Sequence, residues 1–239
     1  MVNGARLTFI DDETVVSFAR DIEKQAATVS DDDIHARSLV MLGKVLDKPG
    51  HREEALRHLE HGRAKLMTIN TLSCDVDFWI ASVHYHENRL PEAVDAAKEA
   101  WKLSDYEAHS LVNQAQISFL LGMILFSANR DTEAWEYMEI CLTRNLELGN
   151  RRDSAITLEY MGYGYLRRGD FLNAYGAYKA AAESYLGTID EDPYCAKCKD
   201  IMAKIDDIQK NPDLNVGFER PRRDNNWPSL FYPRAAASV

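Results

Sequence analysis

The feature that most constrains this chain is a pair of small residues, twelve positions apart, that recurs four times. The pairs are Gly43 with Ala55, Ala81 with Ala93, Gly122 with Ala134, and Gly162 with Ala174. Their first members are separated by 38, 41 and 40 residues, and each pair encloses a short polar stretch such as RRGDFLN. Two antiparallel helices joined by a short turn approach closely only where both backbones carry small side chains. The sequence therefore predicts four stacked helical hairpins.

The residues around each pair support the same interpretation. An apolar residue precedes each first member. Four residues after each second member the side chain is Leu59, Ala97, Met138 or Tyr178. Glycine in the interior of a helix destabilises that helix by about 1 kcal/mol relative to alanine. We therefore expect Gly43, Gly122 and Gly162 to lie where close packing leaves no room for a side chain. No stretch shows sustained two-residue alternation, and most of the chain up to residue 210 has a helical period.

This pattern resembles the tetratricopeptide repeat. The unit that matches best contains Leu158, Met161, Gly162, Tyr165, Ala174, Tyr178 and Ala181. A spacing near 40 residues, instead of the usual length of about 34, is similar to the long-repeat variants of that family. The resemblance extends over residues 36–187. It implies an all-α fold, a right-handed superhelical array of antiparallel helix hairpins.

The sequence predicts four segments. Residues 1–35 should hold an N-terminal capping helix, residues 36–187 the four hairpins, residues 188–210 a C-terminal capping helix, and residues 211–239 an extended tail. The terminal helices of a stacked array need a polar outer face. The tail contains four prolines together with aromatic and basic residues, a composition that disfavours regular structure.

Charge and composition exclude several classes of partner. The net charge is −10 and the pI about 5.2, which disfavours nucleic acid and anionic membranes as partners.

The location of the protein is indicated by three further features of the sequence. The longest apolar run, residues 117–128, is too short to cross a bilayer. The N-terminus lacks the pattern of a secretory signal, and four cysteines are too few for a disulfide framework. We therefore expect a cytoplasmic protein, with the nucleus as the open alternative.

No motif predicts catalysis, a metal or a cofactor. Glu54, His58 and His61 share one helix face and have a spacing that zinc ligands can adopt, but that face should be exposed to solvent. Cys195 and Cys198 form a single CxxC on a predicted helix, with no second pair. We therefore expect no catalytic residue, no metal site and no cofactor.

The resemblance implies that the first helices of the hairpins line a concave groove. Transferring the groove positions of the family one at a time predicts a largely aromatic surface. It comprises Phe78, Tyr85 and His86 from the second hairpin, Phe119, Met123 and Phe126 from the third, and Glu159, Tyr163 and Arg167 from the fourth. Exposed apolar patches usually mark binding surfaces. The alternative is that a tight superhelix, or the tail, makes the apolar members of this set part of the core.

A mixed aromatic groove suits an amphipathic helix or an extended apolar peptide, so we expect a protein–protein or peptide interaction scaffold. The carboxylate clamp of chaperone-binding members is not supported, because only Lys44 matches it. One alternative is a cofactor-independent enzyme or binder that encloses a small apolar molecule, with the polar groove residues available for acid–base chemistry. The other is a structural subunit of an oligomer.

The tail supplies a candidate ligand within the same chain. Residues 211–239 contain four arginines against three acidic residues, so they carry +1 and the remaining 210 residues carry −11. Trp227, Phe231 and Tyr232 are aromatic anchors of the kind that dominate binding energy. We expect the tail to lie against the array, either in its own chain or in a homo-oligomer.

Overall fold

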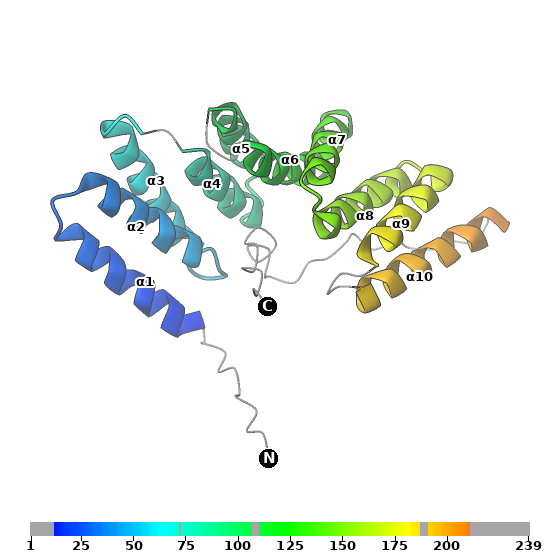
Figure 1. The fold of residues 1–239 in the computed structure, drawn as a ribbon, viewed down its shortest axis with the longest axis horizontal. Helices are drawn as coiled ribbons and strands as arrows, with labels where there is room; N and C mark the ends of the chain where they lie inside the picture. The colour runs from blue at the N-terminus through cyan, green and yellow to red at the C-terminus, as the bar shows by residue number, and fades with distance from the viewer. Residues whose placement is uncertain (1–11, 72, 107–109, 187–190, 211–239) are drawn as a thin grey trace, which may run out of the picture. The chain divides into compact units, whose positions relative to one another are not determined.

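The computed structural model describes residues 12–71, 73–106, 110–186 and 191–210, and these form ten α-helices and no β-strand (Figure 1). The helices are α1 (Asp12–Ala27), α2 (Asp32–Val45), α3 (Arg52–Thr68), α4 (Cys74–His86), α5 (Leu90–Ser104), α6 (Ser110–Ser127), α7 (Asp131–Glu147), α8 (Arg151–Arg167), α9 (Phe171–Tyr185) and α10 (Glu191–Lys210). The most extensive packing occurs within α2–α3, α4–α5, α6–α7 and α8–α9. The prediction of an all-α fold built from four helical hairpins is confirmed. The predicted tail, including Trp227, Phe231 and Tyr232, lies outside the described residues.

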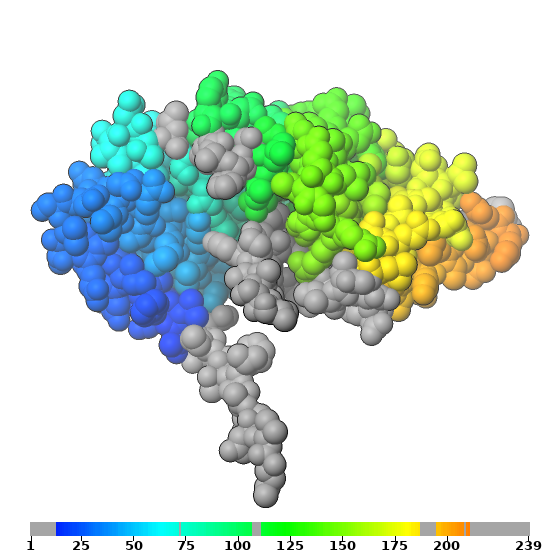
Figure 2. Space-filling model, viewed as in Figure 1, coloured from blue at the N-terminus to red at the C-terminus, as the bar shows by residue number. Residues whose placement is uncertain are grey.

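The chain divides into two compact units, residues 1–107 and residues 108–239. Unit 1 contains α1 to α5, and unit 2 contains α6 to α10. The boundary falls between the second and third hairpins, inside the segment that the sequence predicts as one array. Within each unit, helices that follow one another in sequence pack together, as α8 and α9 do in the space-filling view (Figure 2).

The recurring glycines lie where the two helices of a hairpin approach too closely to admit a side chain. A Cβ atom added to Gly122 would be 2.8 Å from Cε of Met138, and one added to Gly162 would be 2.8 Å from Cε2 of Tyr178. At Gly43 it would be 2.5 Å from Cγ of Leu59. Each glycine therefore faces the large residue that follows its partner alanine by four positions. This is the packing that the twelve-residue spacing predicts.

Three of the hairpins share one type of turn. Asn88, Asn129 and Gly169 adopt positive φ angles of 57°, 58° and 72°, respectively. The next residue then donates its N–H to a carbonyl five residues back, as Arg130 does to Leu125 at 2.9 Å. This is the Schellman arrangement, in which asparagine or glycine tolerates the left-handed conformation. These three hairpins therefore share the same connection between their first and second helices.

The interior of unit 2 contains a helix that is apolar on nearly all sides. Ile117, Leu120 and Ile124 of α6 are buried, although they lie off the face that carries Gly122. A helix of this kind normally belongs to a core. Among the described helices, none combines the length and apolar character needed to cross a membrane.

Candidate interaction surface

In unit 1, side chains from α2 and α4 meet on the face where the sequence predicts the groove. The ammonium of Lys44 forms an ion pair with Asp75 and lies 5.5 Å from the ring centroid of Trp79. The indole N–H of Trp79 donates to Oδ1 of Asp75 at 3.0 Å. The cation therefore lies between a carboxylate and the face of an indole ring, and both interactions stabilise it.

A second polar cluster links the first hairpin to the second. The side chain of Asp47, two residues after the end of α2, is fully buried. Ser82 donates its hydroxyl to Oδ2 of Asp47 at 3.0 Å, and Nδ1 of His86 lies 2.9 Å from the same oxygen. Nε of Arg52 lies 3.5 Å from Oδ1. A buried carboxylate is stable only with several donors of this kind, so the cluster fixes α4 against the turn that follows α2.

The predicted groove residues of unit 1 differ in exposure. Phe78 is buried, with its ring centroid 5.5 Å from that of Trp79. Tyr85 and His86 are partly exposed, and their ring centroids are 6.0 Å apart. Tyr85 and His86 can therefore meet a partner, whereas Phe78 contributes to the interior.

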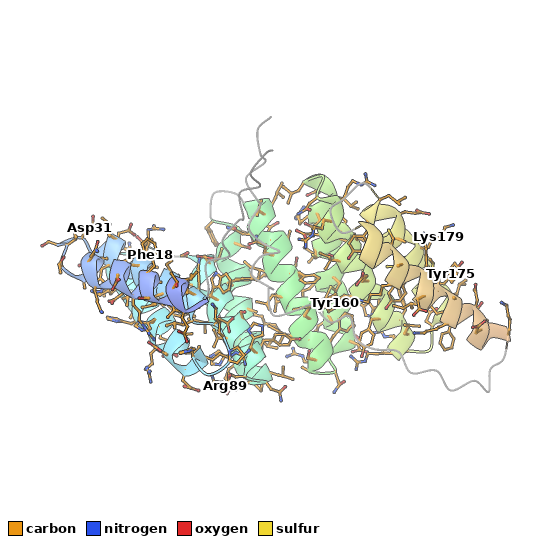
Figure 3. All side chains as sticks on the ribbon, turned by 90° about the horizontal axis from the view of Figure 1, so that it is seen from below. Phe18, Asp31, Arg89, Tyr160, Tyr175 and Lys179 are labelled. Atoms are coloured by element: carbon orange, nitrogen blue, oxygen red, sulfur yellow. The ribbon has the colours of Figure 1, made fainter. Side chains whose placement is uncertain are left out.

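In unit 2, the three apolar groove residues of α6 lie in the interior. Phe119, Met123 and Phe126 are each at most 4% exposed. The ring of Phe119 packs edge-on against Tyr160 of α8 at 5.2 Å between centroids, and Phe126 packs in the same way against Trp135 of α7 at 5.8 Å. Tyr160 is labelled in Figure 3. These side chains fill the space between α6 and its neighbours, which is the alternative that the sequence leaves open.

One residue near these rings had no role in the sequence-based prediction. A Cβ atom added to Gly164 would be 3.0 Å from Cζ of Phe126 and 3.0 Å from Cζ2 of Trp135. Gly164 thus gives the two rings room beside α8. The signal was present in the sequence as the second glycine of Gly162–Tyr163–Gly164, since packing within the hairpin explains only the first.

Arg167 connects the end of α8 to the preceding hairpin. Its Nη1 donates to the carbonyl of Phe126 at 2.8 Å, and its Nη2 donates to Oδ1 of Asn129 at 2.7 Å. Asp131 is 3.7 Å from Nη1. Arg167 and His86 occupy corresponding repeat positions, and each reaches back to the turn region of the hairpin before it.

Glu159 is a buried carboxylate between α8 and α10. Its Oε2 lies 3.2 Å from Nζ of Lys197, and the thiol of Cys198 donates to its Oε1 at 3.8 Å. Burial is the main cause that raises the pKa of Cys198, and the negative charge of Glu159 raises it further. The pKa of Tyr178 is raised for the same two reasons. Tyr163 remains partly exposed on the same helix. Glu159 therefore anchors α10, and Cys198 stays a protonated, buried thiol.

Unit 2 contains a small cavity, which can be compared with the hypothesis that the protein encloses a small apolar molecule. Its volume is about 20 Å³, and it is lined by Ala115, Gln116, Phe119, Cys141, Asn145, Asp153, Ile156 and Thr157. That volume accommodates a single water molecule. This cavity is too small to enclose an organic ligand.

The described residues contain no group of three or more His, Cys, Asp or Glu side chains that could hold a metal ion. Glu54, a member of the zinc-like spacing, instead accepts two hydrogen bonds from Nη2 of Arg20, at 2.8 and 2.9 Å. Burial acts to raise the pKa of Glu54, but the hydrogen bond and charge of Arg20 outweigh it and hold that pKa below its usual value. The carboxylate thus joins α1 to α3.

No family model matches the chain, and no curated protein matches it. Solved structures do match. BtubC (BKLC) from P. vanneervenii aligns with a TM-score of 0.63 and 14% identity, over 91% of this chain and 99% of BtubC. One structure of MamA aligns with a TM-score of 0.53 and 20% identity over 73% of this chain and 88% of MamA, and a second with 0.50 and 18% over 86% and 100%. The chain has a helical-repeat fold. At these identities the likeness shows the fold alone.

Proposed function

We propose that this chain is a non-catalytic protein-interaction scaffold of the tetratricopeptide repeat type. The repeat spacing, the stacked hairpins and the likeness to solved helical-repeat structures support this proposal. The observation that carries it is the face of unit 1 formed jointly by α2 and α4. There, side chains from successive hairpins are held in fixed positions by one another, which is how repeat proteins build extended binding surfaces.

The chemistry of this face suits a peptide with both polar and aromatic contacts. Lys44 and Asp75 are held as an ion pair beside Trp79, and His86 is held by Asp47. Side chains that are already ordered lose little freedom on binding, so such a surface is preorganised. Tyr85 adds a partly exposed aromatic ring of the kind that often dominates binding energy.

Selection from a random peptide library displayed on phage, with the full chain as target, tests this proposal. We expect selected peptides to bind the unmodified chain, and the double variant Tyr85→Ala, Asp75→Ala to bind them at least tenfold more weakly by fluorescence polarisation. Leu172→Ala is the matched control, because Leu172 is exposed on α9 of unit 2. Circular dichroism establishes that both variants are folded. Failure to select any peptide, or equal affinity for both variants, would contradict the proposal.

The C-terminal tail is the ligand that we propose for the chain itself, in cis or within a homo-oligomer. Its net charge of +1 is opposite to that of the remaining residues, and Trp227, Phe231 and Tyr232 supply aromatic anchors. Deletion of residues 212–239 should then lower the melting temperature or change the oligomeric state. If neither changes, the tail is a linear motif for another partner. We also propose a cytoplasmic location, with the nucleus as the alternative, which the four scattered cysteines support.

A further inference from the structure

The first helix of unit 1 carries two apolar rows, and only one of them is buried. Val16, Ala19 and Ala26 form the buried row. The second row consists of Val15, Phe18 and Ile22, at spacings of three and four residues that place them along one flank of the helix. Phe18 is 66% exposed and is labelled in Figure 3, and Val15 and Ile22 are partly exposed.

Helix α2 carries a matching apolar row. Ile34 is 49% exposed, and Met41 and Val45 are partly exposed. Their spacings of seven and four residues place all three on one face of the helix. Met41 lies about 160° around α2 from Gly43, the residue that faces α3. This row therefore points away from α3.

The contacts of α1 show which way its second row points. Arg20 pairs with Glu54 of α3, and Glu23 lies 3.4 Å from Nε2 of His35 on α2. These two contacts define the sides of α1 that face α3 and α2. Val15, Phe18 and Ile22 lie on the flank beyond the α2 side. The two rows therefore form one surface, which we call the N-terminal apolar face: Val15, Phe18, Ile22, Ile34, Met41 and Val45.

The last described helix of the chain behaves differently. In α10, Cys198, Ile201 and Ile205 are buried, while Lys199, Asp200 and Lys204 are exposed. An outer row of charges is what the end of a helical array needs in water. The N-terminal apolar face lacks such a row, and an exposed patch of this kind usually marks an interaction site.

The charges at the edges of this face are complementary to one another. Asp21 is exposed on α1, about 60° around the helix from Phe18, and Arg37 is exposed on α2. Arg37 also pairs with Asp33 at 2.7 Å, which orders its guanidinium. In a twofold arrangement that places α1 of one copy beside α2 of the other, Asp21 of each copy meets Arg37 of the other, so the opposite charges pair twice.

We propose that a second copy of this chain packs on the N-terminal apolar face, with α1 of each copy against α2 of the other. This inference goes beyond the proposed function and does not depend on it, because it concerns α1 and the outer flank of α2 instead of the α2–α4 surface. Two short helices per copy give an interface at the small end of the usual range, so we expect a dissociation constant on the order of micromolar.

Sedimentation velocity on the full chain tests the pairing. We expect the mass to rise from that of the 27.2 kDa monomer towards twice that value as the concentration increases through the micromolar range. Phe18→Glu should raise the dissociation constant at least tenfold. Leu172→Glu is the matched control, since Leu172 is 77% exposed but lies on α9 in unit 2, and it should dimerise as the unmodified chain does. Circular dichroism melts establish that both variants are folded.

A charge exchange tests the arrangement of the two copies. Asp21→Arg should weaken the dimer, and the double variant Asp21→Arg, Arg37→Asp should restore it, because the two residues face each other across the interface. A chain that stays monomeric at the highest concentration, or a Leu172→Glu variant that dissociates as much as Phe18→Glu, would overturn the proposal. Failure of the double variant to restore the dimer would overturn the α1-on-α2 arrangement.

Discussion

The two units use the same repeat position for opposite chemistry. Asp47 and Phe126 each lie four residues after the recurring glycine of their hairpin. In unit 1 this position holds a buried carboxylate that accepts from Ser82 and His86. In unit 2 it holds a buried ring packed between Trp135 and Gly164. The repeat thus determines where a side chain lies, and the residue at that position decides whether neighbouring helices are joined by hydrogen bonds or by apolar packing.

Apolar packing and buried hydrogen bonding lose stability in different ways when a side chain is substituted. Apolar packing between α6 and α8 loses stability in proportion to the volume removed. In a buried polar cluster the loss depends instead on which member is removed, since removal of a shared acceptor leaves several donors without a hydrogen bond in a water-poor site. Variants at the two positions should therefore separate these behaviours.

The largest effect is expected in unit 2. Phe126→Ala should destabilise this unit by about 3–5 kcal/mol, because it leaves a cavity beside Trp135 and Gly164. Urea denaturation followed by tryptophan fluorescence measures the change. Tyr163→Ala, on the partly exposed part of α8, should have a much smaller effect. A loss of less than 1 kcal/mol at Phe126 would show that the ring is not part of a closely packed interior.

Removal of the buried carboxylate in unit 1 should have the next largest effect. Asp47→Ala should destabilise this unit by about 2–4 kcal/mol, since Ser82 and His86 lose their acceptor and Arg52 loses one of its two carboxylate partners. Ser82→Ala, which removes one donor and leaves the others, should lose only about 1 kcal/mol. Denaturant titration measures both variants. Equal losses would mean that the cluster does not act as a unit.

The smallest effect concerns a carboxylate whose burial opposes its charge. Burial raises the pKa of Asp77 to about 6, although the charge of Arg63, whose Nε is 3.0 Å away, acts in the opposite direction. The unfolded chain has the ordinary, lower pKa, so the folded protein binds more protons between about pH 4 and pH 6. The contribution of Asp77 to stability is therefore fully present below pH 4 and is lost as the pH rises through 6.

Asp77→Asn removes this titration. The variant should gain stability relative to the unmodified chain by about 1–3 kcal/mol between pH 4 and pH 7.5. Thermal melts at several pH values measure the difference. If the difference between the two proteins is constant across this range, Asp77 does not titrate as described.

The hairpins were predictable because their signal is local. Gly122 and Met138 lie on consecutive helices, so a fixed spacing along the sequence is also a fixed contact in space. The same argument locates the turns, where asparagine or glycine takes the left-handed conformation.

The candidate surface was harder to predict because it depends on partners that are distant in sequence. Phe119 belongs to the interior because Tyr160, 41 positions later, packs against it. His86 has a fixed position because Asp47, 39 positions earlier, is buried beside it. A list of groove positions gives the side chains but not their neighbours, so it cannot distinguish an aromatic groove from an aromatic core.

The contacts of Arg167 have a consequence for the order in which unit 2 comes apart. Its guanidinium holds the carbonyl of Phe126 and the amide oxygen of Asn129, so the α6–α7 turn is clamped by the end of α8. These contacts oppose fraying of the turn while α8 stays packed, whereas no described contact of this kind joins the turn to α10. Amide hydrogens near Asn129 should therefore exchange with solvent more slowly than those of α10, so α10 should open before the α6–α7 turn does.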